Sequence, residues 1–240
     1  MTSINTTFTS KEHIFFDLDH TLWDFDKNAE ETLNELFSIY KFEQLGFSSA
    51  DVFIETYTRN NHQLWSQYHL GEIDKKYLRK SRFANTFVEL GVEPDLFPSG
   101  FEEDYIQLCP LKTNLFPHAI ETLEYLKEKY TLHLISNGFK EATKAKISNA
   151  NTNIQKYFSH IVISENVGVH KPHPDIFKYA LEGANANKET SIMIGDSIEA
   201  DIRGAQNFGM DAIFFNPNKI NTPQDVKNEI VQLKELMSLF

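Results

Sequence analysis

The sequence predicts an α/β protein in which a doubly wound parallel sheet carries an inserted all-helical domain. Two observations support this prediction. Short apolar runs typical of buried strands alternate with stretches of helical length in the second half of the chain. About 115 residues separate the first apolar run from the second, where a single crossover needs only about a dozen. The alternation indicates parallel strands joined by helices, and the long interval indicates an insertion.

The strands are expected where the chain has a short, nearly continuous apolar run. Five such runs occur, at residues 13–16, 132–135, 161–164, 191–194 and 211–215. Helical stretches accompany the later runs, at residues 117–129, 139–148, 174–182 and 198–208. Four of the five apolar runs end close to Asp, Ser or Asn. This order is typical of a Rossmann-like sheet, whose ligands bind beyond the carboxyl ends of the strands.

The sequence predicts different structures for the two ends of the chain. Apolar residues recur at helical spacing within residues 222–240, namely Val226, Ile230, Leu233 and Leu236 or Met237. We expect a C-terminal helix there that packs back on the sheet. Residues 1–10 are polar and rich in Thr and Ser, so a loose tail is expected at the other end.

The insertion has the pattern of several amphipathic helices. Apolar side chains recur at intervals of three and four residues, as in the group Leu33, Leu36, Phe37 and Tyr40. Glycine and proline residues interrupt the pattern at positions suited to turns. The sequence therefore predicts a helical cap domain, residues 24–108, standing on the strand ends of a core domain formed by residues 11–23 and 109–240.

Composition and charge disfavour several classes of function. The 240 residues carry a formal net charge of -11, which opposes attraction to nucleic acid polymers or anionic lipid. No apolar run approaches the roughly 18 residues that span a bilayer, and no secretory signal opens the chain. The single cysteine, Cys109, cannot form an internal disulfide. We expect a cytoplasmic protein without a membrane or nucleic acid partner, and an anionic substrate would require a bound metal or a well-placed lysine.

The first strand leads directly into Asp-Leu-Asp-His-Thr at residues 17–21. At the end of a strand, Asp17 and Asp19 can both project into the region where a ligand binds. Two carboxylates at such short range repel each other unless a cation is close. One is suited to act as nucleophile and metal ligand, and the other as a proton carrier. An Asp-x-Asp pair taken alone is also compatible with a solvated acidic turn.

Ser136, Asn137 and Gly138 follow the second expected strand and precede a helix. A hydroxyl, a side-chain amide and backbone N–H groups at a helix start form a suitable cradle for a phosphate. The same residue types are common in an ordinary helix cap and turn. Both interpretations remain open for this segment when it is taken alone.

Lys171 lies in a proline-containing loop after the third expected strand. A lysine held there would neutralise a phosphate or the crowded carboxylates, although most such lysines are simply exposed. The neighbouring His170 and His173 have no third metal ligand nearby in the sequence. We therefore expect these two histidines to lie in solvent rather than to bind a metal.

Gly-Asp-Ser-Ile-Glu-Ala-Asp at residues 195–201 follows the fourth expected strand. Asp196 can meet the first acidic pair across neighbouring strand ends, and Asp201 lies in the first turn of the next helix. Hard oxygen ligands suit magnesium, which retains waters and shares a substrate phosphate. Aspartate at a helix start is also stabilising without a ligand. Because all four groups follow different strands, they are expected to meet in one site.

In order and spacing, these four groups resemble the four motifs of the haloacid dehalogenase-like hydrolase superfamily. The matching segments are residues 17–21, 136–138, 171–172 and 195–201. The resemblance extends over about residues 12–216. It identifies the insertion with a cap domain between the first and second motifs. About 35 residues separate the second motif from the third, which leaves no room for a second cap.

The resemblance implies a role for each matching residue. Asp17 would be the nucleophile that forms an aspartyl-phosphate, and Asp19 the general acid and base. Ser136, Asn137 and Lys171 would hold the phosphoryl oxygens. True dehalogenases of this superfamily lack the second aspartate. Because Asp19 can protonate a leaving alcohol, cleavage of a phosphate ester is favoured.

The same resemblance implies a magnesium site. Mg²⁺ would bind Asp17, the backbone carbonyl of Asp19, and Asp196. Asp201 would orient the metal-bound waters or Lys171. Thr21, like Asp201, would contact the metal ligands rather than the metal itself. The expected cofactor is therefore Mg²⁺ alone.

Two further segments resemble the branch of house-cleaning pyrimidine 5′-nucleotidases. They are Leu-Trp-Asp-Phe-Asp at residues 22–26 and Lys-Pro-x-Pro-x-Ile-Phe at residues 171–177. The implied substrate is a nucleoside monophosphate, with aromatic residues of the cap available to stack on its base: Tyr57, Trp65, Tyr68 and Phe83. Helical spacing is expected to bury most of them. Phosphoglycolate and sugar phosphates are alternative substrates.

A different class of function also fits an acidic pocket with a serine and a lysine. A phosphorylatable receiver module has these features, but it has about half this length and no place for the insertion. A catalytically silent phosphate-binding protein on the same fold would be expected to lack Asp17 or Asp19, and both are present. The sequence therefore favours an enzyme.

Overall fold

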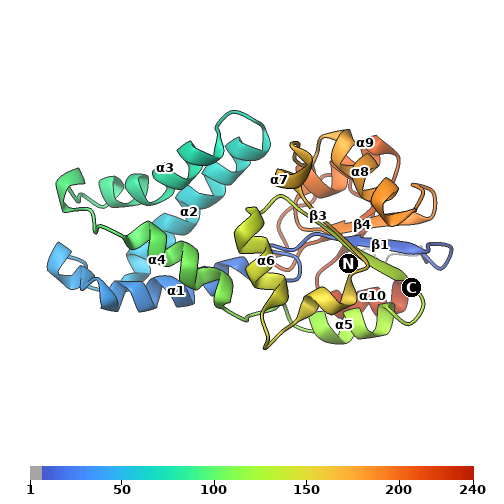
Figure 1. The fold of residues 1–240 in the computed structure, drawn as a ribbon, viewed down its shortest axis with the longest axis horizontal. Helices are drawn as coiled ribbons and strands as arrows, with labels where there is room; N and C mark the ends of the chain where they lie inside the picture. The colour runs from blue at the N-terminus through green and yellow to red at the C-terminus, as the bar shows by residue number, and fades with distance from the viewer. Residues whose placement is uncertain (1–6) are drawn as a thin grey trace. The chain divides into compact units, whose positions relative to one another are not determined.

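The computed structural model describes residues 7–240, and the chain divides into two compact units (Figure 1). The core unit contains the described residues up to Asp24 together with Thr113–Phe240. The helical unit is Phe25–Lys112. Within residues 7–240, no helix combines the length and the apolar character that a bilayer crossing requires.

A six-stranded parallel sheet forms the centre of the core unit. Its strands are β1 (His13–Phe16), β2 (Thr131–Ser136), β3 (His160–Ile163), β4 (Ser191–Gly195), β5 (Asp211–Phe215) and β6 (Glu229–Ile230). Their order is β3-β2-β1-β4-β5-β6, and every neighbouring pair is parallel. The predicted α/β class is confirmed, and each of the five expected strands is present to within one residue at either end.

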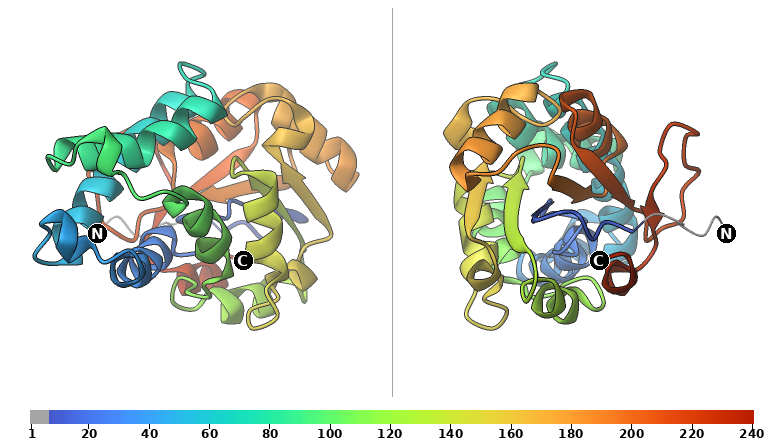
Figure 2. Two further views of the ribbon diagram at one scale, coloured as in Figure 1. Left: turned by 60° about the vertical axis from the view of Figure 1, so that its left-hand side comes forward. Right: turned by 90° about the vertical axis from the view of Figure 1, so that its right-hand side faces the viewer.

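Helices cover both faces of the sheet (Figures 1 and 2). One face carries α7 (Ser164–Val167), α8 (Pro174–Ala184) and α9 (Gly204–Phe208). The other face carries α5 (Ala119–Leu126) and α10 (Leu236–Leu239), and α6 (Lys140–Ser148) follows β2. Because both faces are covered, Ile14, Phe15 and Phe16 of β1 are all fully buried, which explains why the strands are continuous apolar runs.

The strand register brings the carboxyl ends of the central strands to one level. Phe16, the last residue of β1, pairs with Leu134 of β2 and Ile194 of β4. The chain after Phe16 therefore lies beside the last residues of both neighbours, Ser136 and Gly195. Side chains from three strands can converge at this edge of the sheet.

The segment after β4 differs from the single helix expected at residues 198–208. Ile198–Arg203 forms π-helical turns, and α9 begins only at Gly204. The N–H of Ile202 donates to the carbonyl of Ser197 at 3.2 Å, a five-residue interval. The wide turn accompanies an inward-facing Asp201, which is 1% exposed.

The expected helix over residues 222–240 is wrong for most of its length. Glu229–Ile230 forms the edge strand β6, in which Ile230 pairs with Phe215 of β5. A 3₁₀ turn at Leu233–Glu235 then leads into the short helix α10. Gln232 and Glu235 form a capping box that starts the helical turn at this point rather than earlier. The apolar spacing reflects burial against the sheet, which a strand followed by a turn satisfies as well as a helix.

The expected loose tail over residues 1–10 is also wrong where it can be examined. Phe8 is 4% exposed, its N–H donates to the carbonyl of Leu239 at 2.8 Å, and its ring packs against Phe240. Residues 1–6 lie outside the described residues. From Phe8 onward, the N-terminal segment is part of the folded core unit.

The chain leaves the core unit and returns to it through two adjacent segments. Trp23 pairs with Leu115 in an antiparallel bridge, and the N–H of Asp24 donates to the carbonyl of Asn114 at 3.1 Å. The N–H of Phe116 donates to the carbonyl of Leu22 at 3.0 Å. These bonds form a short two-stranded ribbon, and the helical unit connects its two strands.

The helical unit consists of helices joined by short turns. They are α1 (Phe25–Ile39), α2 (Ala50–His69), α3 (Lys75–Glu89) and α4 (Phe101–Leu108), with 3₁₀ turns at Phe42–Leu45, Pro94–Leu96 and Cys109–Leu111. Four phenylalanines, Phe42, Phe53, Phe87 and Phe101, form its centre, with ring centroids 5.1 to 6.0 Å apart. Such aromatic clusters supply much buried apolar area, and this one contains four of the 20 Phe in the sequence.

His133 is a buried histidine in the middle of the sheet. It is 1% exposed, its ring stacks on Phe15 with centroids 4.6 Å apart, and its Nε2 is 3.0 Å from Nδ1 of His13. Its Nδ1 has no hydrogen-bond partner among the described residues. A proton on Nδ1 would be buried without an acceptor. Burial, with the neighbouring His13 and His160, lowers the pKa of His133 to about 4.

We expect His133 to make the protein less stable in mild acid. Between pH 6.5 and about 4 the unfolded chain binds a proton here that the folded chain does not, so unfolding is favoured as the pH falls. The loss at pH 4.5 should be roughly 2–3 kcal/mol. Denaturant unfolding at pH 7 and pH 4.5 tests this: His133→Phe should lose that much less stability than wild type over the interval. Equal losses for the two proteins would contradict the assignment.

Candidate active site

The ammonium group of Lys171 occupies the centre of the site. Lys171 is 1% exposed, and its Nζ donates to Oδ1 of Asp17 at 2.6 Å, to Oδ1 of Asp201 at 2.6 Å and to the carbonyl of Ile135 at 2.8 Å. All three N–H donors of the ammonium are therefore used. One side chain joins the ends of β1 and β2 to the turn after β4.

The chain after β1 folds into a tight turn that places Asp17 and Asp19. The N–H of Asp17 still donates to Ile194 of β4 at 2.9 Å, so the ladder extends one residue beyond the strand. The carbonyl of Leu18 then accepts bonds from Leu22 and Trp23, both at 2.9 Å. Within this turn Thr21 is fully buried, and its hydroxyl donates to Oδ1 of Asp196 at 3.2 Å.

The turn after β2 clamps the loop that carries Lys171. The Asn137 side chain accepts a bond from the Lys171 N–H and donates one to the Lys171 carbonyl, both at 2.9 Å. The Ser136 hydroxyl accepts a bond from the N–H of Gly138 at 3.0 Å. One N–H of the Asn137 amide remains for another acceptor. Asn137 therefore positions Lys171, and its expected contact with phosphate stays a prediction.

Three carboxylates converge where these turns meet. Asp17, Asp196 and Asp201 each offer an oxygen atom that lies within 4.8 Å of the other two. Both oxygens of Asp201 are engaged, Oδ1 by Lys171 and Oδ2 by the N–H of Ser197 at 3.0 Å. A Cβ on Gly195 would lie 2.2 Å from Oδ2 of Asp201, so glycine is required there. Lys171 engages only Oδ1 of Asp17, which leaves Oδ2 for another ligand.

The electrostatics of the cluster oppose full ionisation of its carboxyls. Burial, with the charges of Asp201 and Asp19, raises the pKa of Asp17 to about 7 despite the attraction of Lys171. Burial and the charges of Asp17 and Asp201 also raise the pKa of Asp196 well above its usual range. Burial opposes the charge of Lys171, but the two carboxylates outweigh it and raise the pKa of that ammonium. The site is therefore short of positive charge.

Asp19 has a partner that the sequence reasoning missed. Lys146 of α6 is 5% exposed, and its Nζ donates to Oδ1 of Asp19 at 2.5 Å. The same Nζ lies 4.1 Å from the centre of the Trp23 ring, a cation–π contact that helps to hold it. No motif points to Lys146, since α6 carries several lysines. Its neighbours Thr143 and Ile147 are also buried, so Lys146 lies on the inward-facing side of α6, a position that only the packing of the structure shows.

His170 and His173 belong to no metal-binding group found among the described residues. His173 precedes α8, and its Nδ1 accepts a bond from the N–H of Asp175 at 3.3 Å. Burial lowers the pKa of His170, which is half-buried rather than fully in solvent as expected. Neither residue is part of the cluster around Lys171.

The chain belongs to the haloacid dehalogenase-like hydrolase family, whose model matches residues 11–209. It is therefore an enzyme of the hydrolase class, and a receiver module or a silent binding protein is not supported. The pyrimidine 5′-nucleotidase YjjG of Escherichia coli is 33% identical over 215 residues, which are 89% of each chain. The pyrimidine 5′-nucleotidase PynA of Streptococcus pneumoniae is 29% identical over 228 residues, 93% of this chain and 92% of that protein.

A solved structure extends the similarity to the fold. The crystal structure of the Bacillus subtilis HAD-hydrolase YfnB bound to magnesium has a TM-score of 0.82 and 26% sequence identity to this chain. The match covers 95% of this chain and 98% of that one. The family predicted from the four motifs is confirmed, and so is the parallel-sheet fold predicted from the alternation of apolar runs and helical stretches.

We expect the removal of Lys171 to destabilise the protein most at high pH. Lys171→Met leaves Asp17 and Asp201 buried without a cation, which should cost roughly 3–5 kcal/mol at pH 8. At pH 5 protons replace the missing charge, so the loss should be smaller. Denaturant unfolding in EDTA at both pH values measures the difference. Lys144→Met, an exposed position on α6, should change stability by less than about 0.5 kcal/mol; a similar effect for the two variants would contradict the prediction.

Proposed function

We propose that this hydrolase cleaves phosphate monoesters through an aspartyl-phosphate formed on Asp17. The observation that carries the proposal is the buried Asp17 carboxylate, with one oxygen held by Lys171 and the other available to attack. The free oxygen attacks phosphorus, and the bond between phosphorus and the ester oxygen breaks. Water then attacks the phosphorus of the aspartyl-phosphate, which releases inorganic phosphate and regenerates the carboxylate.

Asp19 moves the protons in both steps. In the first step it gives a proton to the departing ester oxygen, and in the second it takes one from the attacking water. Lys146 holds Oδ1 of Asp19, while Oδ2 is directed toward Gly138, since a Cβ on Gly138 would lie 3.1 Å from it. This orientation keeps the carboxyl beside the segment that carries Ser136. Ser136, Asn137 and Lys171 are proposed to bind the phosphoryl oxygens.

A divalent cation fits the donor set. Three carboxylates face one ammonium, so two negative charges remain uncompensated. At 4.8 Å and an effective dielectric constant of about 20, each pair of carboxylates repels by about 3 kcal/mol. Asp17, Asp196 and the backbone carbonyl of Asp19 would hold Mg²⁺, with Asp201 and Thr21 behind them. When bound, Mg²⁺ supplies positive charge for the phosphoryl oxygens and keeps the carboxyls ionised.

The proposed substrate is a nucleoside 5′-monophosphate with a pyrimidine base. Two pyrimidine 5′-nucleotidases resemble the chain over about nine-tenths of its length, helical unit included. Of the aromatic residues considered for stacking, Tyr57, Tyr68 and Phe83 are buried and Trp65 is half-buried. We propose that the helical unit acts as the cap that selects the substrate, and that the enzyme works in the cytoplasm.

The covalent mechanism predicts different results for the two aspartates. Asp17→Asn should bind substrate but turn over at least about 10³-fold more slowly, because an amide is a poor nucleophile and a weaker metal ligand. Asp19→Asn should slow turnover by roughly 10²- to 10⁴-fold. Phosphate release, measured under saturating substrate, tests both variants. Turnover of Asp17→Asn within tenfold of wild type would rule out Asp17 as nucleophile.

The metal site predicts a dependence on Mg²⁺ that does not rely on activity alone. EDTA should abolish phosphate release, and Mg²⁺ should restore it. Mg²⁺ should also raise the Tm of the wild-type protein, because it binds the folded state and relieves the repulsion among the carboxylates. Asp196→Asn should show little of this shift. Full turnover after exhaustive chelation, or an unchanged Tm shift in Asp196→Asn, would contradict the proposed site. Ca²⁺ should substitute poorly because it prefers more ligands at longer distances.

A substrate panel tests the proposed specificity. We expect kcat/KM for UMP, CMP, dUMP or dTMP to exceed that for AMP, phosphoglycolate and sugar phosphates. Released phosphate is measured for each compound with Mg²⁺ present. If phosphoglycolate or a sugar phosphate is preferred tenfold over every nucleotide, the nucleotidase proposal is wrong, while the phosphatase proposal stands.

A further inference from the structure

Arg82 is a buried arginine in the helical unit whose donors are not fully used. It lies on α3, is 4% exposed, and its Nε and Nη2 have no hydrogen-bond partner among the described residues. Buried guanidinium groups are normally paired, because an unpaired buried charge is costly. Two N–H donors of this buried cation therefore remain unused, an arrangement that folding stability alone does not favour.

The residues around Arg82 hold its guanidinium group in place but do not accept hydrogen bonds from Nε or Nη2. Its central carbon lies 5.1 Å from the centre of the Phe83 ring and 5.2 Å from that of Tyr105. These aromatic contacts stabilise a cation but accept no hydrogen bond. Glu102 approaches Nη2 only to 3.7 Å, and the same Oε1 atom already accepts a bond from Arg79 at 2.9 Å. The position of Arg82 is therefore fixed while its donors stay available.

The geometry of the free donors limits the ligand. Nε and Nη2 lie on one edge of the guanidinium, and their N–H bonds point in parallel. Such a fork binds two acceptor atoms in one plane, or one acceptor shared by both. A carboxylate, a phosphate or the carbonyl edge of a nucleobase has suitable acceptors.

A second side chain without a hydrogen-bond partner limits the class of ligand further. Asn61 of α2 is 1% exposed, and its Oδ1 has no hydrogen-bond partner among the described residues. Helices α2 and α3 pack together, with Tyr57 stacked on Phe83 at 5.0 Å between centroids. Phosphate and carboxylate ions present only acceptors, so neither would satisfy the Asn61 oxygen. A pyrimidine base presents both carbonyl acceptors and an N–H donor on its polar edge.

We propose that Arg82 and Asn61 form the site that recognises the polar edge of the pyrimidine base. This inference rests on the proposed nucleotidase function and assigns the base-reading role to two residues of the helical unit. Arg82 donates to acceptors of the base, and Asn61 accepts from its N–H group. In the free protein both side chains have unused hydrogen-bonding groups, and the bound base forms hydrogen bonds with them.

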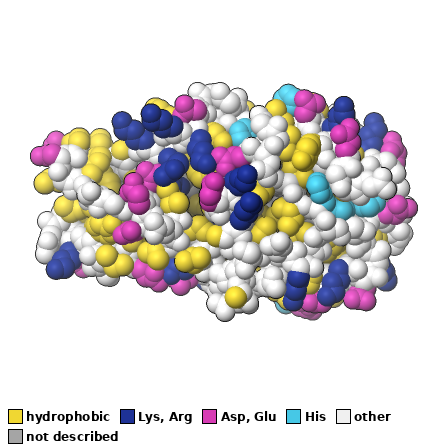
Figure 3. Space-filling model, viewed as in Figure 1, with side chains coloured by type: hydrophobic (Ala, Val, Ile, Leu, Met, Phe, Trp, Pro, Cys, Tyr) yellow, Lys and Arg dark blue, Asp and Glu magenta, His cyan; other side chains and the backbone are white. Residues whose placement is uncertain are grey.

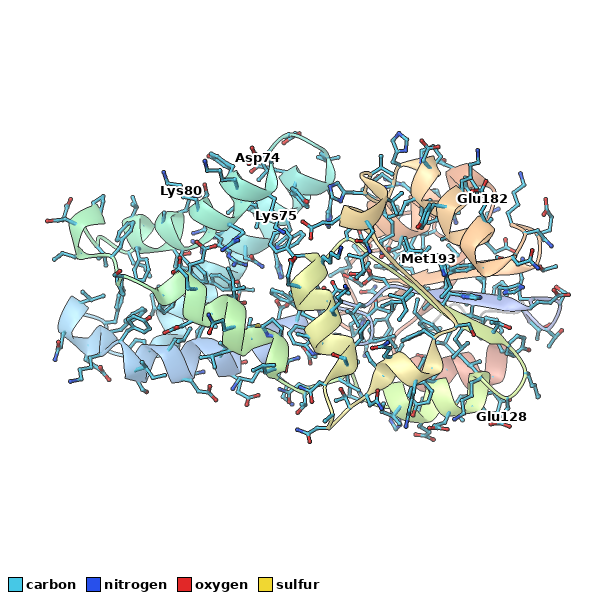
Figure 4. The ribbon with its side chains drawn as sticks, in the orientation of Figure 1. Asp74, Lys75, Lys80, Glu128, Glu182 and Met193 are labelled. Atoms are coloured by element: carbon cyan, nitrogen blue, oxygen red, sulfur yellow. The ribbon has the colours of Figure 1, made fainter. Side chains whose placement is uncertain are left out.

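The charge of α3 agrees with an anionic ligand. This helix carries Lys75, Lys76, Arg79, Lys80 and Arg82 in a chain of net charge -11. Lys and Arg side chains gather over α3 in the space-filling view (Figure 3), and Figure 4 shows Lys75 and Lys80 on this helix. Such a local excess of positive charge attracts a nucleotide to a protein that is acidic elsewhere.

The experiment compares nucleotides with a substrate that has no base. kcat/KM is measured for CMP, UMP and p-nitrophenyl phosphate in wild type, Arg82→Met, Arg82→Lys and Asn61→Leu, together with Tm. The ratio of kcat/KM for each nucleotide to that for p-nitrophenyl phosphate should fall at least tenfold in all three variants, mainly through KM. Arg59→Gln is the matched control, an exposed arginine on α2, and should leave the ratio unchanged.

Stability provides the second readout. If Arg82 is kept for a ligand, Arg82→Met should have a Tm equal to or above that of wild type, because it removes an incompletely paired buried charge. An unchanged ratio in the three variants, or a lower Tm for Arg82→Met, would overturn the inference. Arg82→Lys keeps the charge but cannot form two parallel N–H donor bonds, so an unchanged nucleotide ratio in this variant would also overturn the inference. A wild type that cleaves p-nitrophenyl phosphate but no nucleotide would instead refute the nucleotidase proposal.

Discussion

The contact of one buried ammonium with two carboxylates organises the core unit. Lys171 joins Asp17, which follows β1, to Asp201, which lies in the turn after β4, and its third donor is used by the backbone of β2. Several local features exist because of this contact. Asn137 fixes the lysine backbone, and Gly195 leaves space for the Asp201 carboxylate. The parallel register supplies the remaining condition, since it brings the three strand ends to one level.

Each unit contains a buried charged group whose charge or hydrogen-bonding capacity its own side chains do not fully satisfy. In the core unit the excess is negative, with Asp196 added to the pair that Lys171 holds. In the helical unit two N–H donors of Arg82 are unused, although Glu102 lies 3.7 Å from its Nη2. Folding alone favours neither arrangement, because apolar residues of similar size would be at least as stable. Buried polar groups that do not serve stability are expected where a protein binds a ligand. The carboxylates of the core unit suit a bound cation, and the unused donors of Arg82 suit a ligand with hydrogen-bond acceptors.

Sequence patterns predicted the features that depend on local order. Strands buried on both faces are apolar runs, so β1 and β5 were predicted at their observed bounds. Prediction failed where tertiary contacts decide the structure. Ile230 has helical spacing but joins the sheet, and Phe8 lies in a polar segment but packs against Phe240. Lys146 and Arg82 were missed because lysine and arginine are usually exposed, and only the packing of distant segments shows that these two are buried.

The short ribbon formed by residues 22–24 and 114–116 has a consequence for how the two units are combined in one chain. Its two strands are already hydrogen-bonded to each other within the core unit. The entropic cost of closing the chain between them therefore grows only slowly with the length of what they enclose. A different helical module, or a turn of a few residues, in place of residues 25–112 should therefore leave the sheet and the cluster around Lys171 unchanged. In the proposed function the helical unit selects the substrate and the core unit carries the chemistry, so a fold of this kind lets the two change independently.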